Sequence, residues 1–183
     1  MKNNQETYLN LVVETASKIA TEQAIIIHQQ LKDQEEKKVK DKRLRNTKLL
    51  LKNYKDFKAY VNRVEGNVVD RHQTSDVEMT IKDLLVRGED VVKTIKQSTQ
   101  RTIMMVGYID QALDAFKYIC EHDPFKDSFR QFEVLHLRYV EGVTIETIAE
   151  TFSINERNVY KAIDVAAERL SVILFGVYGL NFN

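Results

Sequence analysis

Residues 144–170 read TIETIAETFSINERNVYKAIDVAAERL, and this stretch decides the fold class. Thr144 and Asn155 are residue types that favour the position before a helix, because their side-chain oxygens accept hydrogen bonds from the first backbone amides. Behind each of them, apolar residues recur at helical spacing. They are Ile145, Ile148 and Ala149 after the first cap, and Val159, Ile163, Ala166 and Leu170 after the second. The sequence therefore predicts a short helix and a longer one, joined by a tight turn between Phe152 and Ile154.

Another helix is expected upstream, from Asp127 to about Val140, and Gly142 should end it because glycine tolerates the left-handed backbone. Its inward residues should be Phe132, Leu135 and Tyr139. A short helix, a tight turn and a longer helix with polar residues early form the layout of a helix-turn-helix reader of duplex DNA. Outward side chains of the second helix would enter the major groove, where Arg and Lys pair with guanine, Asn with adenine and Glu with cytosine. The candidate DNA-binding residues of this module are Thr144, Asn155, Glu156, Arg157, Asn158, Tyr160 and Lys161.

The segment from Phe132 to Leu170 resembles region 4 of bacterial sigma factors, the helix-turn-helix that reads the −35 promoter element. The resemblance is carried by Leu137-Arg138-Tyr139, by the Glu141-Gly142-Val143-Thr144 turn, by Ile148-Ala149-Glu150 and by the core positions Val159 and Ala166. It implies that Glu156, Arg157 and Lys161 read bases, with Asn158 and Tyr160 toward the DNA backbone. Tyr160 stands where a sigma factor typically carries Arg, which predicts weaker binding or a different sequence preference.

Positive charge is concentrated in one 22-residue block, residues 37–58, with ten basic and two acidic residues and a net charge of +8. Apolar residues within it keep helical spacing, which predicts a basic amphipathic helix. This helix either continues the one expected from residue 5 or follows a break near Asp41, and Gly66 and Asn67 should end it. Phosphate contact and a merely solvated helix face remain open for the block. Its candidate DNA-binding residues are Arg43, Arg45, Lys48 and Lys52.

Residues 42–54, KRLRNTKLLLKNY, resemble the N-terminal block of sigma-like regulators encoded by phages of Gram-positive bacteria, the ArpU-like late-gene activators. That resemblance implies a helical N-terminal part coupled to a region-4-like module, and a role in late phage transcription. It implies duplex DNA as a partner and host RNA polymerase as a second one. No segment resembles the sigma-factor region that melts promoter DNA.

The most regular apolar pattern lies in residues 90–122, where a heptad seam runs through nine positions. They are Val92, Ile95, Thr99, Thr102, Val106, Ile109, Leu113, Phe116 and Cys120. This coiled-coil-like helix should pack either on the N-terminal helix of the same chain or on a second copy, as a homodimer. A shorter helix is expected before it, from Ser75 or Asp76 to Gly88. Pro124 then predicts a boundary between a helical domain, 1–123, and a helix-turn-helix domain, 124–183.

Composition limits the remaining function classes. One proline and six glycines in 183 residues favour an all-α fold, and a formal net charge of zero argues against a nucleic-acid coat protein. The lone Cys120, the lack of a membrane-length apolar run and the polar N-terminus predict a cytoplasmic protein without membrane contact. The four histidines lack metal-ligand spacing and no catalytic motif is present, so no enzyme activity, metal or cofactor is expected.

Three functions remain open on these residues. The first is a sequence-specific transcriptional regulator of phage or prophage type that reads promoter DNA. The second is a DNA-recognition subunit for phage DNA packaging, similar to a small terminase subunit, which also joins a helix-turn-helix to an oligomerising helical part. The third is a helical assembly or adaptor protein without DNA contacts, because trihelical units also occur without them.

Overall fold

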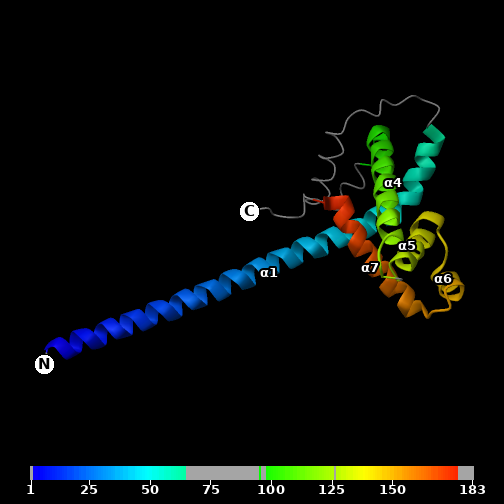
Figure 1. The fold of residues 1–183 in the computed structure, drawn as a ribbon. Coiled ribbons are helices and arrows are strands. Elements are labelled where there is room, and N and C mark those ends of the chain that lie inside the picture. Colours follow the sequence, from blue (N-terminus) through cyan, green and yellow to red (C-terminus); the bar gives the residue numbers. More distant parts are fainter. Residues whose placement is uncertain (1, 65–94, 96–97, 126, 177–183) are drawn as a thin grey trace. The chain divides into compact units, whose positions relative to one another are not determined.

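A computed structural model of the chain describes residues 2–64, 95, 98–125 and 127–176, with side chains from residue 10 onward, except that of residue 64. In these ranges every regular element is a helix and no strand occurs, which confirms the predicted all-α fold (Figure 1). Contacts divide the chain into two compact units, Met1–Lys40 and Asp41–Asn183. The short helix expected from Ser75 or Asp76 to Gly88 lies outside the described residues.

The N-terminal helix α1, Lys2–Val64, is continuous, so the break considered near Asp41 does not occur. Neither proline nor glycine interrupts residues 2–64, and every backbone amide there can join the helical hydrogen-bond ladder. The described part ends at Val64, and the predicted stop at Gly66 and Asn67 lies beyond it.

The heptad helix expected over residues 90–122 is present as α4, Thr99–Glu121, and it begins later than predicted, because Ser98 has an extended backbone with φ of −125° and ψ of 114°. The seam position Val92 lies outside the described residues. Ser98 caps α4 by accepting a hydrogen bond from the Arg101 amide. All six seam positions within α4 from Thr102 to Cys120 are buried, and Met105 and Ala112 widen the buried face. The seam packs within the chain, against α1 and α7, so the intramolecular alternative holds for the described part of the helix.

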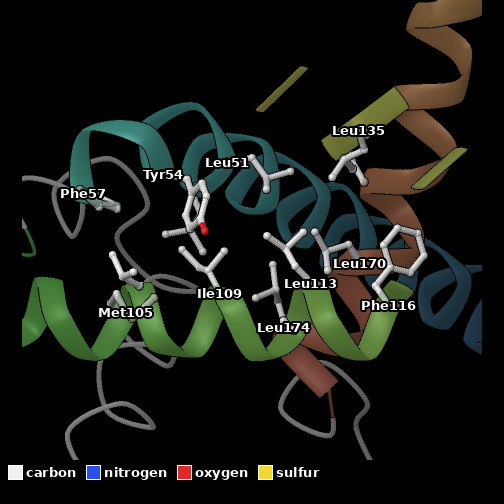
Figure 2. Close-up of a cluster of buried hydrophobic side chains, with 14 of the residues drawn as sticks. Leu51, Tyr54, Phe57, Met105, Ile109, Leu113, Phe116, Leu135, Leu170 and Leu174 are labelled. Carbon is white, nitrogen blue, oxygen red and sulfur yellow. The ribbon is translucent and has the colours of Figure 1, made fainter. Parts of the chain in front are cut away.

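One hydrophobic core joins residues 41–64 of α1 with α4 and the C-terminal helices. Figure 2 shows the labelled side chains of α1 facing those of α4, with Leu135, Leu170 and Leu174 closing the same cluster. Tyr54 and Phe57 are the largest α1 side chains in it, each 1% exposed. Residues on both sides of Pro124 share this core, while the domain boundary proposed there remains a prediction.

The C-terminal region consists of α5, Asp127–His136, the π-helical turn η1, Leu137–Glu141, then α6, Ile145–Thr151, and α7, Glu156–Phe175. The helix expected from 127 to about 140 therefore changes geometry in its last turn. The amides of Gly142 and Val143 both donate to the Leu137 carbonyl, and Gly142 adopts the expected left-handed conformation with φ of 79°. That conformation favours glycine and ends the helix.

Candidate nucleic-acid interface

Both predicted caps of the two-helix unit are confirmed. The Thr144 hydroxyl accepts a hydrogen bond from the Thr147 amide at 3.2 Å, and Asn155 Oδ1 accepts one from the Asn158 amide at 2.9 Å. These bonds satisfy amides that have no partner within the first turn of a helix. They fix where α6 and α7 begin, and thus which residues occupy the first turns of α7.

The turn between α6 and α7 contains a left-handed residue that sequence reasoning missed. Ser153 has φ of 52°, in a region that costs a non-glycine residue free energy. The Ile154 amide then donates to the Ala149 carbonyl at 2.9 Å, which closes the turn onto the end of α6. No glycine or asparagine stands at position 153 to signal this conformation.

A small second core holds α6 and α7 together. Ile148 and Val159 are 0% exposed, and Ala149 lies beside them, as the spacing predicted. Val134 of α5 completes this core although the sequence had not marked it as inward. Because both helices are packed through buried apolar side chains, the polar residues of α7 are held outward on a fixed support.

The first two turns of α7 present the predicted readers to solvent. Each of the seven candidates in this module is exposed: Thr144, Asn155, Glu156, Arg157, Asn158, Tyr160 and Lys161. Tyr160 is 54% exposed, so its ring and hydroxyl are accessible to a ligand. The hydroxyl of Thr144 and the Oδ1 atom of Asn155 already serve as caps, so these two residues have fewer polar atoms left for a ligand than the other five.

The four candidates in the basic helix are placed differently from one another. Arg45 and Lys52 are exposed, whereas Arg43 is half-buried with its Nε and Nη1 atoms covered. Lys48 forms an ion pair with Asp164 of α7, with 2.7 Å between Nζ and Oδ1. The pair is partly solvated, so its contribution to stability is about 1 kcal/mol or less. Its structural consequence is that the basic stretch of α1 lies beside α7.

Lys55 makes a contact with η1 that the sequence did not predict. Its Nζ donates to the Glu141 carbonyl at 3.0 Å, at the end of η1. Arg45, Lys48, Lys52 and Lys55 follow one another at spacings of three, four and three residues, so they share one face of α1. Two of these four cations contact the C-terminal helices, and Arg45 and Lys52 lie on the same face with exposed side chains. This helical spacing was a signal available in the sequence.

Tyr139 marks the place where this cationic face meets η1 and α7. Burial raises the pKa of the Tyr139 phenol, the charges of Lys48 and Arg138 lower it, and the charge of Asp164 raises it. The Arg138 guanidinium also donates to the Val143 carbonyl at 3.1 Å. Lys48 of α1 therefore lies at the middle of α7, where it pairs with Asp164 three residues after Lys161, while Arg138 is held at the turn that precedes α6.

Asp123 fixes the other end of the module. Its carboxylate accepts hydrogen bonds from the Ser128 hydroxyl at 2.7 Å, the Phe125 amide at 3.0 Å and the Arg169 guanidinium at 2.7 Å. These bonds hold the pKa of Asp123 below its usual value, and the Ser128 bond is the largest cause. Arg169 also lies over the Phe116 ring, 5.6 Å from its centroid. Asp123 thus ties the corner between α4 and α5 to α7.

In the described ranges, no group of three or more His, Cys, Asp or Glu side chains could hold a metal ion. None of the helices in those ranges is long and apolar enough to cross a membrane.

Comparison with known proteins returns no match: no family model, no curated protein and no solved structure matches the chain.

Proposed function

We propose that the chain is a sequence-specific DNA-binding transcriptional regulator that reads duplex DNA with the first two turns of α7. The observation that carries this proposal is the set of five exposed polar residues, Glu156 to Lys161 without Val159, held on a helix whose opposite face is fully packed. A helix presented in this way fits the width of the major groove. Rigid support of such readers by a neighbouring helix is what base recognition requires.

Each reader has a chemistry that suits a base edge or a phosphate. Arg157 and Lys161 are one helical turn apart and can donate to guanine, while Glu156 can accept from the cytosine amino group. Asn158 and Tyr160 are suited to contacts with the DNA backbone. The module alone is not strongly attracted to phosphates, since residues 125–183 carry six basic and eight acidic side chains, a net charge of −2.

The cationic face of α1 supplies the attraction that the module lacks. Arg45 and Lys52 are exposed on the face whose other two cations, Lys48 and Lys55, contact α7 and η1. Phosphates that flank the bases read by α7 would lie within reach of this face. Phosphate contacts of this kind carry little sequence information but a large part of the affinity, and they make binding strongly dependent on salt.

The phage or prophage type of regulation, the contact with host RNA polymerase and a cytoplasmic location are proposed on the resemblance to sigma region 4 and to ArpU-like activators. The cap at Thr144, the glycine turn at Gly142 and the buried Ile148 and Val159 are compatible with that resemblance. The same proposal assigns the chain no catalytic role.

A mobility-shift titration tests the assignment of the reading helix. The DNA is first obtained by selecting bound sequences from a random pool, with and without RNA polymerase. The double variant Arg157→Ala/Lys161→Ala should lose at least tenfold in affinity for the selected site, since two charge-assisted contacts disappear. A matched control, Lys117→Ala/Arg130→Ala, removes the same charge from exposed positions on α4 and α5 and should bind nearly as the parent does.

Equal losses in the two double variants would contradict a reading role for α7, because only net charge would then matter. Selection of no preferred sequence, together with binding that does not change with salt, would favour the adaptor alternative. Variants of the cationic face of α1 are expected to weaken all DNA sequences alike and to lower the dependence of affinity on salt by about one contact per lysine.

A further inference from the structure

The N-terminal unit carries an apolar surface that the function proposed above does not use. Every residue from Asn10 to Lys38 is exposed. Eight large apolar side chains in this stretch are between 47% and 64% exposed, and they are Leu11, Val12, Val13, Ile19, Ile25, Ile26, Ile27 and Leu31. Such a density of exposed apolar side chains on one helix is typical of an interface.

These side chains are ordered along the helix. Val12, Ile19 and Ile26 are seven residues apart, and so are Val13, Ala20 and Ile27. Seven residues are nearly two helical turns, so each set forms a column that runs along α1. The two columns are neighbours about 100° apart, because consecutive residues of a helix are separated by that angle. Together they are wider than the narrow seam that a two-stranded coiled coil buries.

The surface also repeats itself. Val12-Val13 and Ile26-Ile27 are two apolar pairs in these columns, separated by 14 residues, or about 21 Å along the helix. A second copy in the parallel direction would place each pair beside itself. A second copy in the antiparallel direction, centred between Ile19 and Ala20, would place 12–13 beside 26–27. In both directions the apolar surface is complementary to itself.

Most charged residues lie where such packing leaves them in water. Lys18, Lys32 and Glu36 are on the side of α1 away from the two columns, Glu22 borders the column of Ile19 and Ile26, and Asp33 follows that column beyond its last apolar residue. Burial of the columns from Val12 to Ile27 therefore requires no charge at their centre, where an unpaired buried charge would oppose association. Because the two columns fall on consecutive residues, they form a face broader than an a/d seam, and such a face is buried more completely by two neighbouring helices than by one.

We propose that residues 10–31 are a self-association surface, on which the same segments of other copies pack in a bundle of three or more helices. A helix in a protein gains most of its stability from packing of its apolar face, and an unpacked helix is only marginally stable in water. The bundle would supply this packing to the exposed part of α1. Association would also carry several copies of the C-terminal module on one particle. Multivalent attachment raises apparent affinity without new contacts, which suits a module of net charge −2.

The mass of the full chain in solution tests this proposal without DNA. Light scattering after size-exclusion chromatography should give at least three times the monomer mass of 21.3 kDa. The variant Ile19→Lys/Ile26→Lys places two charges in one apolar column and should shift the mass to that of the monomer. The control variant Thr21→Lys/His28→Lys adds two lysines with the same spacing on the opposite side of α1 and should keep the parental mass.

Hydrogen exchange of the α4 amides is measured on each variant, so that loss of association is separated from loss of folding in the unit 41–183. A monomeric parent protein would overturn self-association and leave another protein as the occupant of the surface. A dimer would overturn the bundle of three or more helices. Equal dissociation of both variants, or of neither, would overturn the assignment of the interface to the two columns. None of these outcomes depends on whether the protein binds DNA.

Discussion

The two parts of α1 have similar apolar spacing and different surroundings. In residues 10–36 all apolar side chains are exposed, whereas Leu50, Leu51, Tyr54 and Phe57 are each 1% exposed. Neither part contains proline or glycine, so helix propensity does not distinguish them. The difference lies in the partner, because the second part packs on α4 and α7 of the same chain. Periodicity predicts which residues face a partner, and the arrangement of the other helices decides whether the chain itself provides one.

The two parts also use their charges differently. In the packed part, Lys48, Lys55 and Lys58 each reach a partner on another element, namely Asp164, the Glu141 carbonyl and Asp110. In residues 10–36, the described hydrogen bonds are local, such as that from Gln29 to Asp33 at 2.9 Å. A cation-rich stretch therefore does two things in this protein, since some lysines position helices and others, such as Lys52, remain available to a ligand.

The largest expected difference in the free energy of unfolding is between two truncations on α1, one of a buried side chain and one of an exposed side chain. Phe57→Ala should lower the free energy of unfolding of the unit 41–183 by about 3–5 kcal/mol, because it leaves a cavity in the core shared with α4. Ile26→Ala, at a position 56% exposed, should leave that free energy nearly unchanged. Urea titration followed by hydrogen exchange of the α4 amides gives both values. Similar losses in the two variants would contradict the division of α1 into two environments.

The next effect concerns the contact of Lys55 with η1. Gly142→Ala should destabilise the unit by about 1–2 kcal/mol, because alanine is strained at positive φ and its Cβ would clash with the Lys55 side chain. Gly107→Ala is the matched control, since Gly107 lies in α4 with no atom within 4 Å of the added Cβ. That control should raise stability by up to about 1 kcal/mol. Thermal unfolding of both variants checks the opposite signs.

A smaller effect is expected from the polar contact between α1 and α4. The Tyr54 hydroxyl donates to Asp110 and accepts from Lys58 Nζ at 2.8 Å, and burial is the largest cause that raises the pKa of the phenol. Tyr54→Phe should cost about 0.5–1.5 kcal/mol, the usual value of a hydrogen bond in a folded protein.

Tyr60→Phe is the control for this contact. The Tyr60 hydroxyl bonds to Thr99 Oγ1 at 2.7 Å in an exposed position, where water can replace the lost partner. Its cost in the same urea titration should be smaller than that of Tyr54→Phe. A cost for Tyr54→Phe no larger than that of Tyr60→Phe would show that the half-buried contact of Tyr54 with Asp110 contributes no more to stability than an exposed hydrogen bond.

Much of the fold could be predicted from local signals. The caps at Thr144 and Asn155, the left-handed Gly142 and the seam from Thr102 to Cys120 all depend on residues close in sequence, and all are confirmed. Local signals suffice there because helix ends and apolar faces are decided within a few turns. The continuity of α1 could not be decided in the same way, since a charged residue such as Asp41 neither breaks nor requires a helix.

The same distinction between local signals and long-range contacts applies to the candidate site. Exposure of Arg157 and Lys161 follows from the apolar spacing of α7, so it could be predicted. The pairing of Lys48 with Asp164 joins residues 116 positions apart, and no local pattern specifies it. The π-helical turn and the left-handed Ser153 also escaped prediction, because their residue types are common in ordinary helices and turns.

The stability of the packed unit, residues 41–183, should depend on pH through Asp123, a residue that the N-terminal unit does not contain. The folded-state pKa of Asp123 is lowered, first by the Ser128 hydroxyl and then by the Phe125 amide and Arg169. A carboxyl group with a lowered pKa stabilises the folded state above its unfolded pKa of about 3.9, and this stabilisation is lost as the pH falls through the folded value. Asp123→Asn should therefore reduce the stability of unit 41–183 at pH 7 and make it fall less steeply toward pH 3.

Ser128→Ala should shift the same curve in the same direction by a smaller amount, because the amide and guanidinium bonds to Asp123 remain. Both variants are measured by urea unfolding at a series of pH values. If the acid limb of the curve keeps its parental slope in Asp123→Asn, other carboxylates govern the acid sensitivity of the unit, and the corner between α4 and α5 is held mainly by its apolar contacts. A reduced slope would instead show that Asp123 carries part of the acid sensitivity of the unit, through the bonds that join this corner to Ser128 of α5 and Arg169 of α7.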